Sequence, residues 1–346
     1  MILDYLNKIA GMLAIVLMLG AFPSVNGVCV EAAVYENTEE KDADDVAALT
    51  KLIEKAGTQG AGVSESLDGD QYWWIDGKLV GLDWDRCKLT GEWDFGGLKN
   101  LEILDISFNE ISKLDVSACP KLDGLFCYNN KLSKLDVSRC TELTVLECDR
   151  NKLSKLDVSK CPKLEGLDCC DNKLSKLDVS KCPKLKVLNC GDNKLSKLDV
   201  SKCSKLEELD CYVNKLSKLD VSKCSKLNGL FCYNNKLSKL NVRGCKNLDE
   251  LECNSNKLSK LDVSKCPKLG WLQCDDNKLS KLDVSKCPKL RWLFCENNKL
   301  SKLDVSKCTK LETLYCEGNK KLKELVISKK ADIWLEMDKG VKIVKK

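Results

Sequence analysis

The sequence contains no histidine among its 346 residues. Histidine is the commonest general base and a frequent metal ligand near neutral pH, so its absence argues against a hydrolase or a metalloenzyme. The chain also lacks a glycine-rich loop of the kind that binds phosphate, and no nucleophile stands beside a base. We therefore predict that the protein is not an enzyme, and we expect no cofactor and no metal site.

Long apolar segments are also scarce. One eleven-residue run, MLAIVLMLGAF at 12–22, follows Lys8 and precedes small-residue patterns at 25–27 and 30–32. Crossing a bilayer takes about 20 apolar residues, so this run is too short for a membrane anchor, which is the alternative. We expect residues 1–32 to be a cleaved secretory signal peptide, which leaves no membrane span. The mature protein should be secreted or extracellular, or associated with a cell surface.

One motif dominates the rest of the chain. NKLSKLDVSKC begins at Asn151 and is present in seven identical copies. Asparagine itself stands every 21 residues from Asn109 to Asn319, eleven times in all. A fixed period of this length is typical of a solenoid, in which each coil contacts only its neighbours.

Each unit reads L-x-x-L-x-C-x-x-N-x-L-x-x-L-x-V-x-x-C-x-x, and its 21 positions are numbered here from the first leucine. The alternation around L-x-C and L-x-V predicts short strands with one inward face. In-register stacking would place equivalent residues about 4.8 Å apart. The asparagines would then form a buried ladder, whose amide groups need hydrogen-bond partners in every coil.

The first eleven positions resemble a leucine-rich repeat, and the second half of the unit echoes the first with cysteine in place of asparagine. This doubling is similar to the nested 21-residue subclass of bacterial leucine-rich repeats, sometimes called the IRREKO type, over residues 79–327. The resemblance implies a right-handed leucine-rich-repeat solenoid of about 12 repeats, mostly parallel β with short strands on two faces and little helix. It also implies a secreted bacterial binding scaffold.

Both ends of the solenoid should be capped. The segment DADDVAALTKLIEKAG at 42–57 begins with acidic residues and has apolar residues at helical spacing. Residues 33–78 are therefore expected to form an N-terminal cap with an amphipathic helix and a connector. Near the C-terminus, ADIWLEMDKGVKIV alternates around an Asp-Lys-Gly turn, which predicts a β-hairpin cap over residues 328–346.

The chain has 23 cysteines, of which ten occupy the sixth position of the repeat and ten the nineteenth. A secreted, cysteine-rich chain usually contains disulfides. In stacked coils, however, parallel side chains would keep the Cβ atoms about 4.8 Å apart, against about 3.8 Å in a disulfide. We predict buried free thiols that fill the core, with disulfides or metal binding as alternatives. Cys170, at an outward seventh position, is expected to be the accessible thiol.

Nearly all differences between repeats fall at the second, third, fifth, seventh and eighth positions, which should face outward around the L-x-C strand. In the ten units that start at Leu122 through Leu311, these positions hold eighteen acidic and three basic residues. With the unit that starts at Leu101 included, the same positions also hold every aromatic residue between 101 and 321. The opposite face, KLSKLDVSK, hardly varies although it is equally exposed. We therefore interpret the variable face as a binding surface.

Trp271, Trp292, Phe294 and Tyr315 lie in three successive units and are predicted to form the main contact. The other candidate binding residues of the face are Phe126, Tyr128, Tyr212, Phe231, Tyr233, Glu165, Asp168, Glu207, Asp210 and Glu252.

These features predict a monomeric scaffold that binds a protein with a basic or mixed, partly apolar surface. The alternative is a glycan-binding module that uses the aromatic platform around Trp271 and Trp292. Nucleic acid is not expected as a partner, because the acidic variable face repels phosphate.

Overall fold

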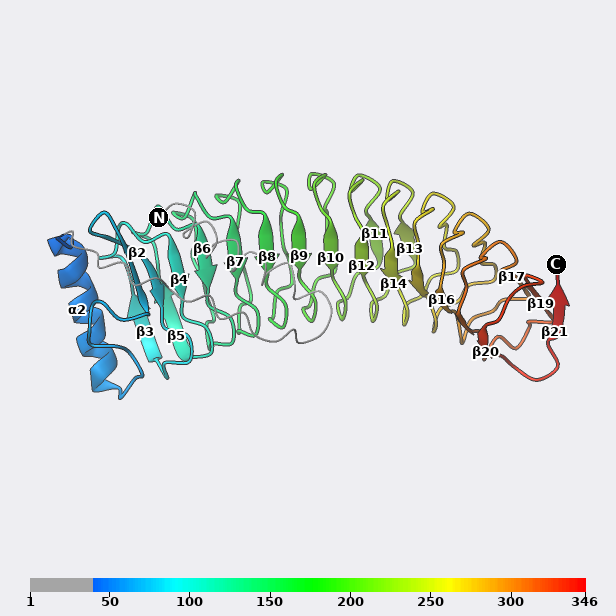
Figure 1. The fold of residues 1–346 in the computed structure, drawn as a ribbon, viewed down its shortest axis with the longest axis horizontal. Coiled ribbons are helices and arrows are strands. Elements are labelled where there is room, and N and C mark those ends of the chain that lie inside the picture. The colour runs from blue at the N-terminus through cyan, green and yellow to red at the C-terminus, as the bar shows by residue number, and fades with distance from the viewer. Residues whose placement is uncertain (1–39) are drawn as a thin grey trace.

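The computed structural model describes residues 40–346. The predicted signal peptide and Cys29 lie outside the described residues. The described chain forms an elongated, gently arched rod, with one helix at its N-terminal end and strands stacked along its whole length (Figure 1). No helix in residues 40–346 is both long enough and apolar enough to pass through a bilayer.

One sheet of fourteen strands runs the length of the rod, in the order β1-β2-β4-β6-β7-β8-β9-β10-β12-β14-β15-β16-β18-β20. Its first pair is antiparallel, and every later pair is parallel and in register, so Leu209 lies beside Leu188 and Leu230. The strands are β1 (Tyr72–Ile75), β2 (Lys78–Asp83), β4 (Ile103–Asp105), β6 (Gly124–Phe126), β7 (Val145–Glu147), β8 (Gly166–Asp168), β9 (Val187–Asn189), β10 (Glu208–Asp210), β12 (Gly229–Phe231), β14 (Glu250–Glu252), β15 (Trp271–Gln273), β16 (Trp292–Phe294), β18 (Thr313–Tyr315) and β20 (Trp334–Glu336).

The opposite side of the solenoid is paired only in places. Its strands are β3 (Thr90–Asp94) with β5 (Glu110–Asp115), β11 (Lys218–Asp220) with β13 (Lys239–Asn241), and β17 (Lys302–Asp304) with β19 (Glu324–Ile327) and β21 (Lys342–Lys345). The prediction of a leucine-rich-repeat solenoid with little helix is confirmed. The predicted strands of the second face are present in some coils, but they do not form a continuous sheet along the rod.

The invariant motif of this second side has a local structural cause. The fifteenth-position aspartates accept a hydrogen bond from the backbone two residues later, as Asp136 Oδ1 does from Ser138 N at 2.9 Å. This bond holds the turn that follows, and it lowers the pKa of the Asp136 carboxyl. The conservation of LDVS between copies therefore follows from turn geometry.

The core is one continuous column of leucine, valine and cysteine. Side chains at the first, fourth, sixth, eleventh, sixteenth and nineteenth positions are almost fully buried along the rod. All 22 described cysteines are free thiols. Those at the nineteenth position donate weakly to the valine carbonyl of the preceding coil, as Cys161 Sγ does to Val137 O at 3.7 Å. Burial raises the pKa of the sixth-position Cys148 thiol well above its usual range, which favours its protonated and less reactive form.

The buried asparagines satisfy the backbone between coils. Asn235 Nδ2 donates to the carbonyls of Cys211, Cys232 and Tyr233 at 2.9, 3.3 and 3.2 Å, and its Oδ1 accepts from Leu216 N at 2.9 Å. Cys211 and Leu216 belong to the preceding coil, so one side chain ties two coils together. The same set recurs from Asn130 to Asn298.

The N-terminal helix α2 (Ala43–Thr58) closes the first coil, as predicted. Asp42 caps it by accepting from the backbone N–H groups of Asp44 and Asp45 at 3.0 and 3.1 Å. Leu49, Leu52 and Ala56 are buried against the solenoid. The sequence analysis did not anticipate that Asp45, 2% exposed, would accept from Leu79 N and Asn100 Nδ2 and so fix the helix to the first coils.

The predicted C-terminal hairpin is wrong. β20 pairs in parallel with β18, and β21 pairs in parallel with β19, so the two strands lie on different sides of the rod. The turn at Asp338, Lys339 and Gly340 carries the chain from one side to the other, and Gly340 has a φ of 88°. Alternation around a short turn suits a hairpin and a solenoid coil equally well. The segment completes a further coil because Leu335 stacks in register on Leu314.

Replacing Asn235 by alanine tests the ladder. The change leaves the buried N–H of Leu216 without its acceptor and removes one of the two donors from each of three carbonyls, so it should lower the free energy of unfolding by about 1–3 kcal/mol. Asn228→Ala, at an exposed position of the same coil, is the matched control and should change it by less than about 0.5 kcal/mol. Chemical denaturation of both variants measures the difference. Equal stability of the two would contradict the structural role of the ladder.

Candidate binding surface

The outer face of the fourteen-stranded sheet carries the variable positions. Third- and fifth-position side chains lie on the strands, and the others lie in the flanking turns. Residues at the eighth position, from Phe108 to Asn297, have φ between 42° and 51°. This left-handed region favours glycine, asparagine and aspartate. The acidic residues Asp171, Asp192 and Asp276 at this position therefore follow backbone geometry, and they are not evidence of binding.

Four of the predicted residues form one cluster, which we call the C-terminal aromatic cluster. The ring centroids of Trp271 and Trp292 are 5.5 Å apart, and that of Phe294 is 5.1 Å from Trp271. Tyr315 meets Phe294 edge to face at 5.2 Å. All four side chains are half-buried, because they cover one another on adjacent strands.

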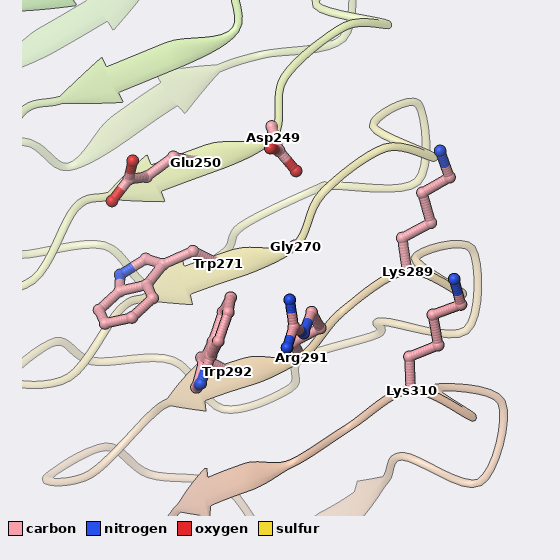
Figure 2. Close-up of a pocket in the computed structure, with 8 residues that line it drawn as sticks. All are labelled: Asp249, Glu250, Gly270, Trp271, Lys289, Arg291, Trp292 and Lys310. Atoms are coloured by element: carbon pink, nitrogen blue, oxygen red, sulfur yellow. The ribbon is translucent and has the colours of Figure 1, made fainter. Parts of the chain in front are cut away.

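A surface hollow of about 350 Å³ lies beside this cluster (Figure 2). Gly270 stands between Asp249 and Arg291 at the second position, where other coils have longer side chains. A Cβ at Gly270 would come within 2.8 Å of Asp249 Oδ1, so the glycine keeps the floor open. The hollow is lined by Asp249, Glu250, Gly270, Trp271, Lys289, Arg291, Trp292 and Lys310.

Arg291 covers part of the cluster. Its guanidinium lies 4.3 Å from the centroid of the Trp292 ring, and Nη2 is 2.7 Å from Glu312 Oε1. The ion pair is exposed and adds little stability, but it holds the guanidinium over the indole. One face of Trp292 is therefore already occupied.

The remaining predicted aromatic residues lie in two separate groups. Tyr212 and Tyr233 stack with centroids 5.0 Å apart, and Phe231 lies on the coil of Tyr233. Phe126 and Tyr128 lie five coils away from the corresponding pair. Phe126 is only 9% exposed because it packs with Ile103 and Val145 of the adjacent strands. Phe126 therefore offers little contact area to a ligand.

Trp334 was missed as a candidate because its segment was assigned to a hairpin cap. It occupies the third position of the last coil, beside Thr313, and is 67% exposed. The stacking register, once extended past Asn319, would have placed it on the variable face.

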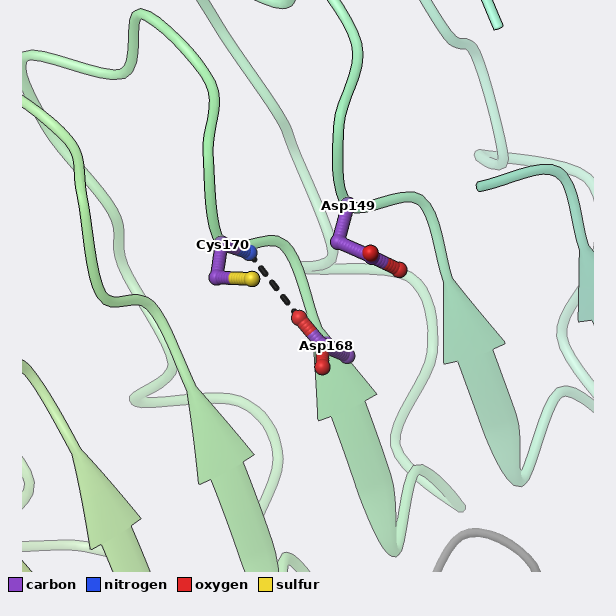
Figure 3. Close-up of side chains that lie close together, drawn as sticks. All are labelled: Asp149, Asp168 and Cys170. Atoms are coloured by element: carbon purple, nitrogen blue, oxygen red, sulfur yellow. Dashed lines mark hydrogen bonds between the residues drawn. The ribbon is translucent and has the colours of Figure 1, made fainter. Parts of the chain in front are cut away.

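The predicted carboxylates are partly buried, and two of them already have ion-pair or hydrogen-bond partners. Glu165 pairs with Lys186 at 2.6 Å, and Asp168 accepts from Cys170 N (Figure 3) and Asn189 Nδ2, both at 2.9 Å. Burial, with the neighbouring Glu208 charge, raises the pKa of Asp210 to about 8. Burial and Glu250 likewise raise the pKa of Glu252 to about 7. Glu207 is half-buried on the same coil as Asp210.

A row of acceptors without donors follows the seventh position of the repeat. Within residues 40–346, eight buried side-chain polar atoms have no hydrogen-bond partner, and six of them belong to seventh-position residues. These six residues are Asp85, Ser107, Asn254, Asp275, Glu296 and Asp338. The two others, Asp210 Oδ1 and Trp271 Nε1, lie on the same face. Three of these residues, Asn254, Asp275 and Glu296, lie in successive coils, so this stretch of the face can accept hydrogen bonds from a partner.

The raised carboxyl pKa values predict how stability depends on pH. Between an ordinary carboxyl pKa near 4 and the values of about 7 to 8 at Glu252 and Asp210, the folded chain holds more protons than the unfolded chain. Stability should therefore fall as the pH rises from about 5 to about 8. Thermal unfolding across this range measures the slope.

Asp210→Asn should raise the melting temperature at pH 8 much more than at pH 5, because the amide carries no charge to desolvate. The control is Glu317→Gln, at an exposed seventh position. A pH slope that Asp210→Asn leaves unchanged would show that this carboxylate titrates normally.

Comparison with known proteins identifies the repeats. The family described as "Leucine Rich repeats (2 copies)" matches residues 162–203 and 288–329, and the family "Leucine Rich Repeat" matches residues 100–122. No curated protein matches the chain.

Several solved structures resemble the protein. The functional domain of InlJ from Listeria monocytogenes, described as including a cysteine ladder, is 38% identical with a TM-score of 0.66. The match covers 71% of this chain and 58% of that one, so the chain spans little more than half the length of the InlJ domain.

Two further structures agree in fold alone. A leucine-rich-repeat protein of Leptospira interrogans is 23% identical with a TM-score of 0.59, and covers 71% of this chain and 77% of its own. An internalin, inlF of Listeria monocytogenes, is 21% identical with a TM-score of 0.55, and covers 82% of this chain and 94% of its own. The chain thus carries leucine-rich repeats and is homologous to bacterial leucine-rich-repeat proteins of the internalin type.

Proposed function

Because the chain is a leucine-rich-repeat solenoid homologous to the Listeria protein InlJ, we propose that it is a secreted, non-enzymatic scaffold that binds a protein partner. The observation that carries the proposal is the run of unpartnered acceptors at the seventh position of three successive coils, on Asn254, Asp275 and Glu296. A partner that lies along this edge with lysine, arginine or backbone N–H donors would satisfy them. Such a partner has a basic or mixed surface.

The C-terminal aromatic cluster supplies the apolar part of the proposed interface. Tryptophan, tyrosine and arginine are the residue types that most often dominate protein interfaces, and Trp271, Trp292 and Arg291 meet here. The unpartnered Trp271 Nε1 adds a donor among these acceptors. Trp271, Trp292 and Phe294 of the cluster lie on the same two coils as the acceptors of Asp275 and Glu296, so apolar and polar contacts can be made together.

The same geometry favours a protein over a glycan. A sugar ring binds flat against an open aromatic face, but the guanidinium of Arg291 covers one face of Trp292. The two indole planes are also tilted by 46° and do not form a flat platform. The glycan-binding alternative would need Arg291 to leave its ion pair with Glu312.

The test starts from arrays of extracellular proteins and of glycans, probed at low and at high salt. A protein ligand whose binding weakens with salt is expected, because exposed charge pairs are screened. Glycan ligands that bind independently of salt, with no protein ligand, would contradict the proposal.

Trp271→Ala with Trp292→Ala should weaken binding of that ligand at least tenfold, since truncating an aromatic anchor costs about 2 kcal/mol or more. The matched control is Tyr212→Ala with Tyr233→Ala, the stacked pair on the same face. Titration calorimetry measures both, with melting curves to confirm folding. If the tyrosine variant loses affinity and the tryptophan variant does not, the main contact lies in the middle of the face.

A further inference from the structure

The second side of the rod carries a dense field of positive charge. In the nine coils that start at Leu122 through Leu290, the tenth to eighteenth positions hold 27 lysine and arginine residues against eight aspartates. All 27 basic side chains are exposed. We call this surface the lysine face. Because the net charge of the whole chain is only +5, the positive charge is concentrated on this side.

These basic side chains have few partners in the protein. Within residues 40–346, only Lys131, Arg243 and Lys302 of the 27 form ion pairs. Each of the eight aspartates accepts a hydrogen bond from the backbone two residues later, as Asp199 Oδ1 does from Ser201 N at 2.9 Å. The aspartates thus serve the turns, and most of the positive charge is left to attract an anion from outside.

The lysines of the thirteenth position are aligned along the rod. Lys218 of β11 pairs in register with Lys239 of β13, so these two side chains start about 4.8 Å apart. Like charges that lie opposite each other on adjacent strands destabilise a sheet. The nine lysines at this position therefore lower the stability of the free protein, and a bound anion would remove the cost.

The copies that depart from the common motif keep the positive charge. Arg139 replaces the eighteenth-position lysine in the first of the nine coils. In the coil that starts at Leu227, Asn241 replaces the aspartate and Arg243 supplies the third basic residue. Asn241 Oδ1 still accepts from Arg243 N at 3.3 Å, so the turn needs the acceptor and not the negative charge. Turn geometry therefore explains the aspartates but requires none of the lysines.

We propose that the lysine face binds a linear, base-free polymer of phosphodiester groups, which lies along the rod. A polymer with one charge in every unit meets lysines of successive coils and releases its counterions as it binds. Lysine is a compact point charge that suits phosphate, whereas bidentate binding of carboxylates favours arginine. The 27 basic residues include only two arginines.

The rest of the molecule narrows the choice of ligand. The tenth to eighteenth positions of these nine coils contain no aromatic residue, so the lysine face offers no ring on which a nucleobase or a sugar can stack. The variable face on the other side of the rod is acidic and repels phosphate, so it confines the polymer to the lysine face. This surface is separate from the one proposed to bind a protein, and both ligands can be held at once.

The test uses the full chain and a fluorescently labelled poly(glycerol phosphate) long enough to span the nine coils, with binding measured by fluorescence anisotropy. We expect saturable binding whose affinity falls about a hundredfold between about 50 and 200 mM salt, as for roughly five neutralised phosphates. Polygalacturonate of equal charge should bind several-fold more weakly, because its anionic groups are carboxylates. Single-stranded poly(dT) should bind no more tightly than the base-free polymer.

Two triple variants locate the polymer on the protein. Neutralising three adjacent thirteenth-position lysines should weaken binding about tenfold and make the slope of log affinity against log salt shallower by about two. The substitutions are Lys176→Gln, Lys197→Gln and Lys218→Gln. The matched control removes three exposed lysines near the N-terminal end and should change affinity by less than about twofold. These control substitutions are Lys51→Gln, Lys78→Gln and Lys99→Gln.

The double variant Trp271→Ala with Trp292→Ala separates this proposal from the protein-binding one, because it should leave polymer binding unchanged. Equal losses in the two lysine variants would show that net charge alone attracts the polymer. No binding at about 50 mM salt, loss of binding in the tryptophan variant, or tighter binding of polygalacturonate or poly(dT) would each overturn the proposal. Melting curves of every variant confirm that it is folded.

Discussion

The interaction on which the rest of the structure depends is the set of hydrogen bonds that each buried asparagine makes to the coil before it. Asn235 binds three carbonyls and one N–H, and two of those groups lie one coil away. The N–H of Leu216 has no other acceptor in the described chain, so an amide oxygen must recur at this corner of every coil. That requirement sets the 21-residue period, and the period brings leucine and cysteine into register. A core this uniform leaves the outer positions free to change.

The two sides of the rod differ in what constrains their outer side chains. The second side is fixed locally, because aspartates such as Asp136 hold the turns that follow them. The main sheet needs nothing from its outer side chains, and they include groups that lower stability. Asp210 is a half-buried carboxylate and Glu147 a buried one, and both have neighbouring negative charges. Such residues lower the stability of the scaffold, which fits the basic partner that we propose.

The sequence predicted the solenoid, the capping helix and the contact between Trp271 and Trp292, because all three depend on spacing within a fixed period. It could not predict how deeply an outer side chain is buried by its neighbours on adjacent strands. Phe126 is buried because Ile103 and Val145 of the adjacent strands pack against it, and the buried Glu147 is paired in register with Phe126. The C-terminal error has a different cause: alternation around Gly340 fits two topologies, and only the stacking of Leu335 on Leu314 decides between them.

Deleting residues from the centre of the chain tests the dependence on the asparagine ladder most directly. Removing residues 185–205 takes out one whole coil and keeps every asparagine in register. Removing residues 185–194 keeps leucines in the core but places Cys203 where the ladder needs an amide. Chemical denaturation should show a cooperative, slightly less stable protein for the first deletion and a large loss of stability for the second. Equal stability of the two would contradict the account, because leucine packing alone would then be sufficient.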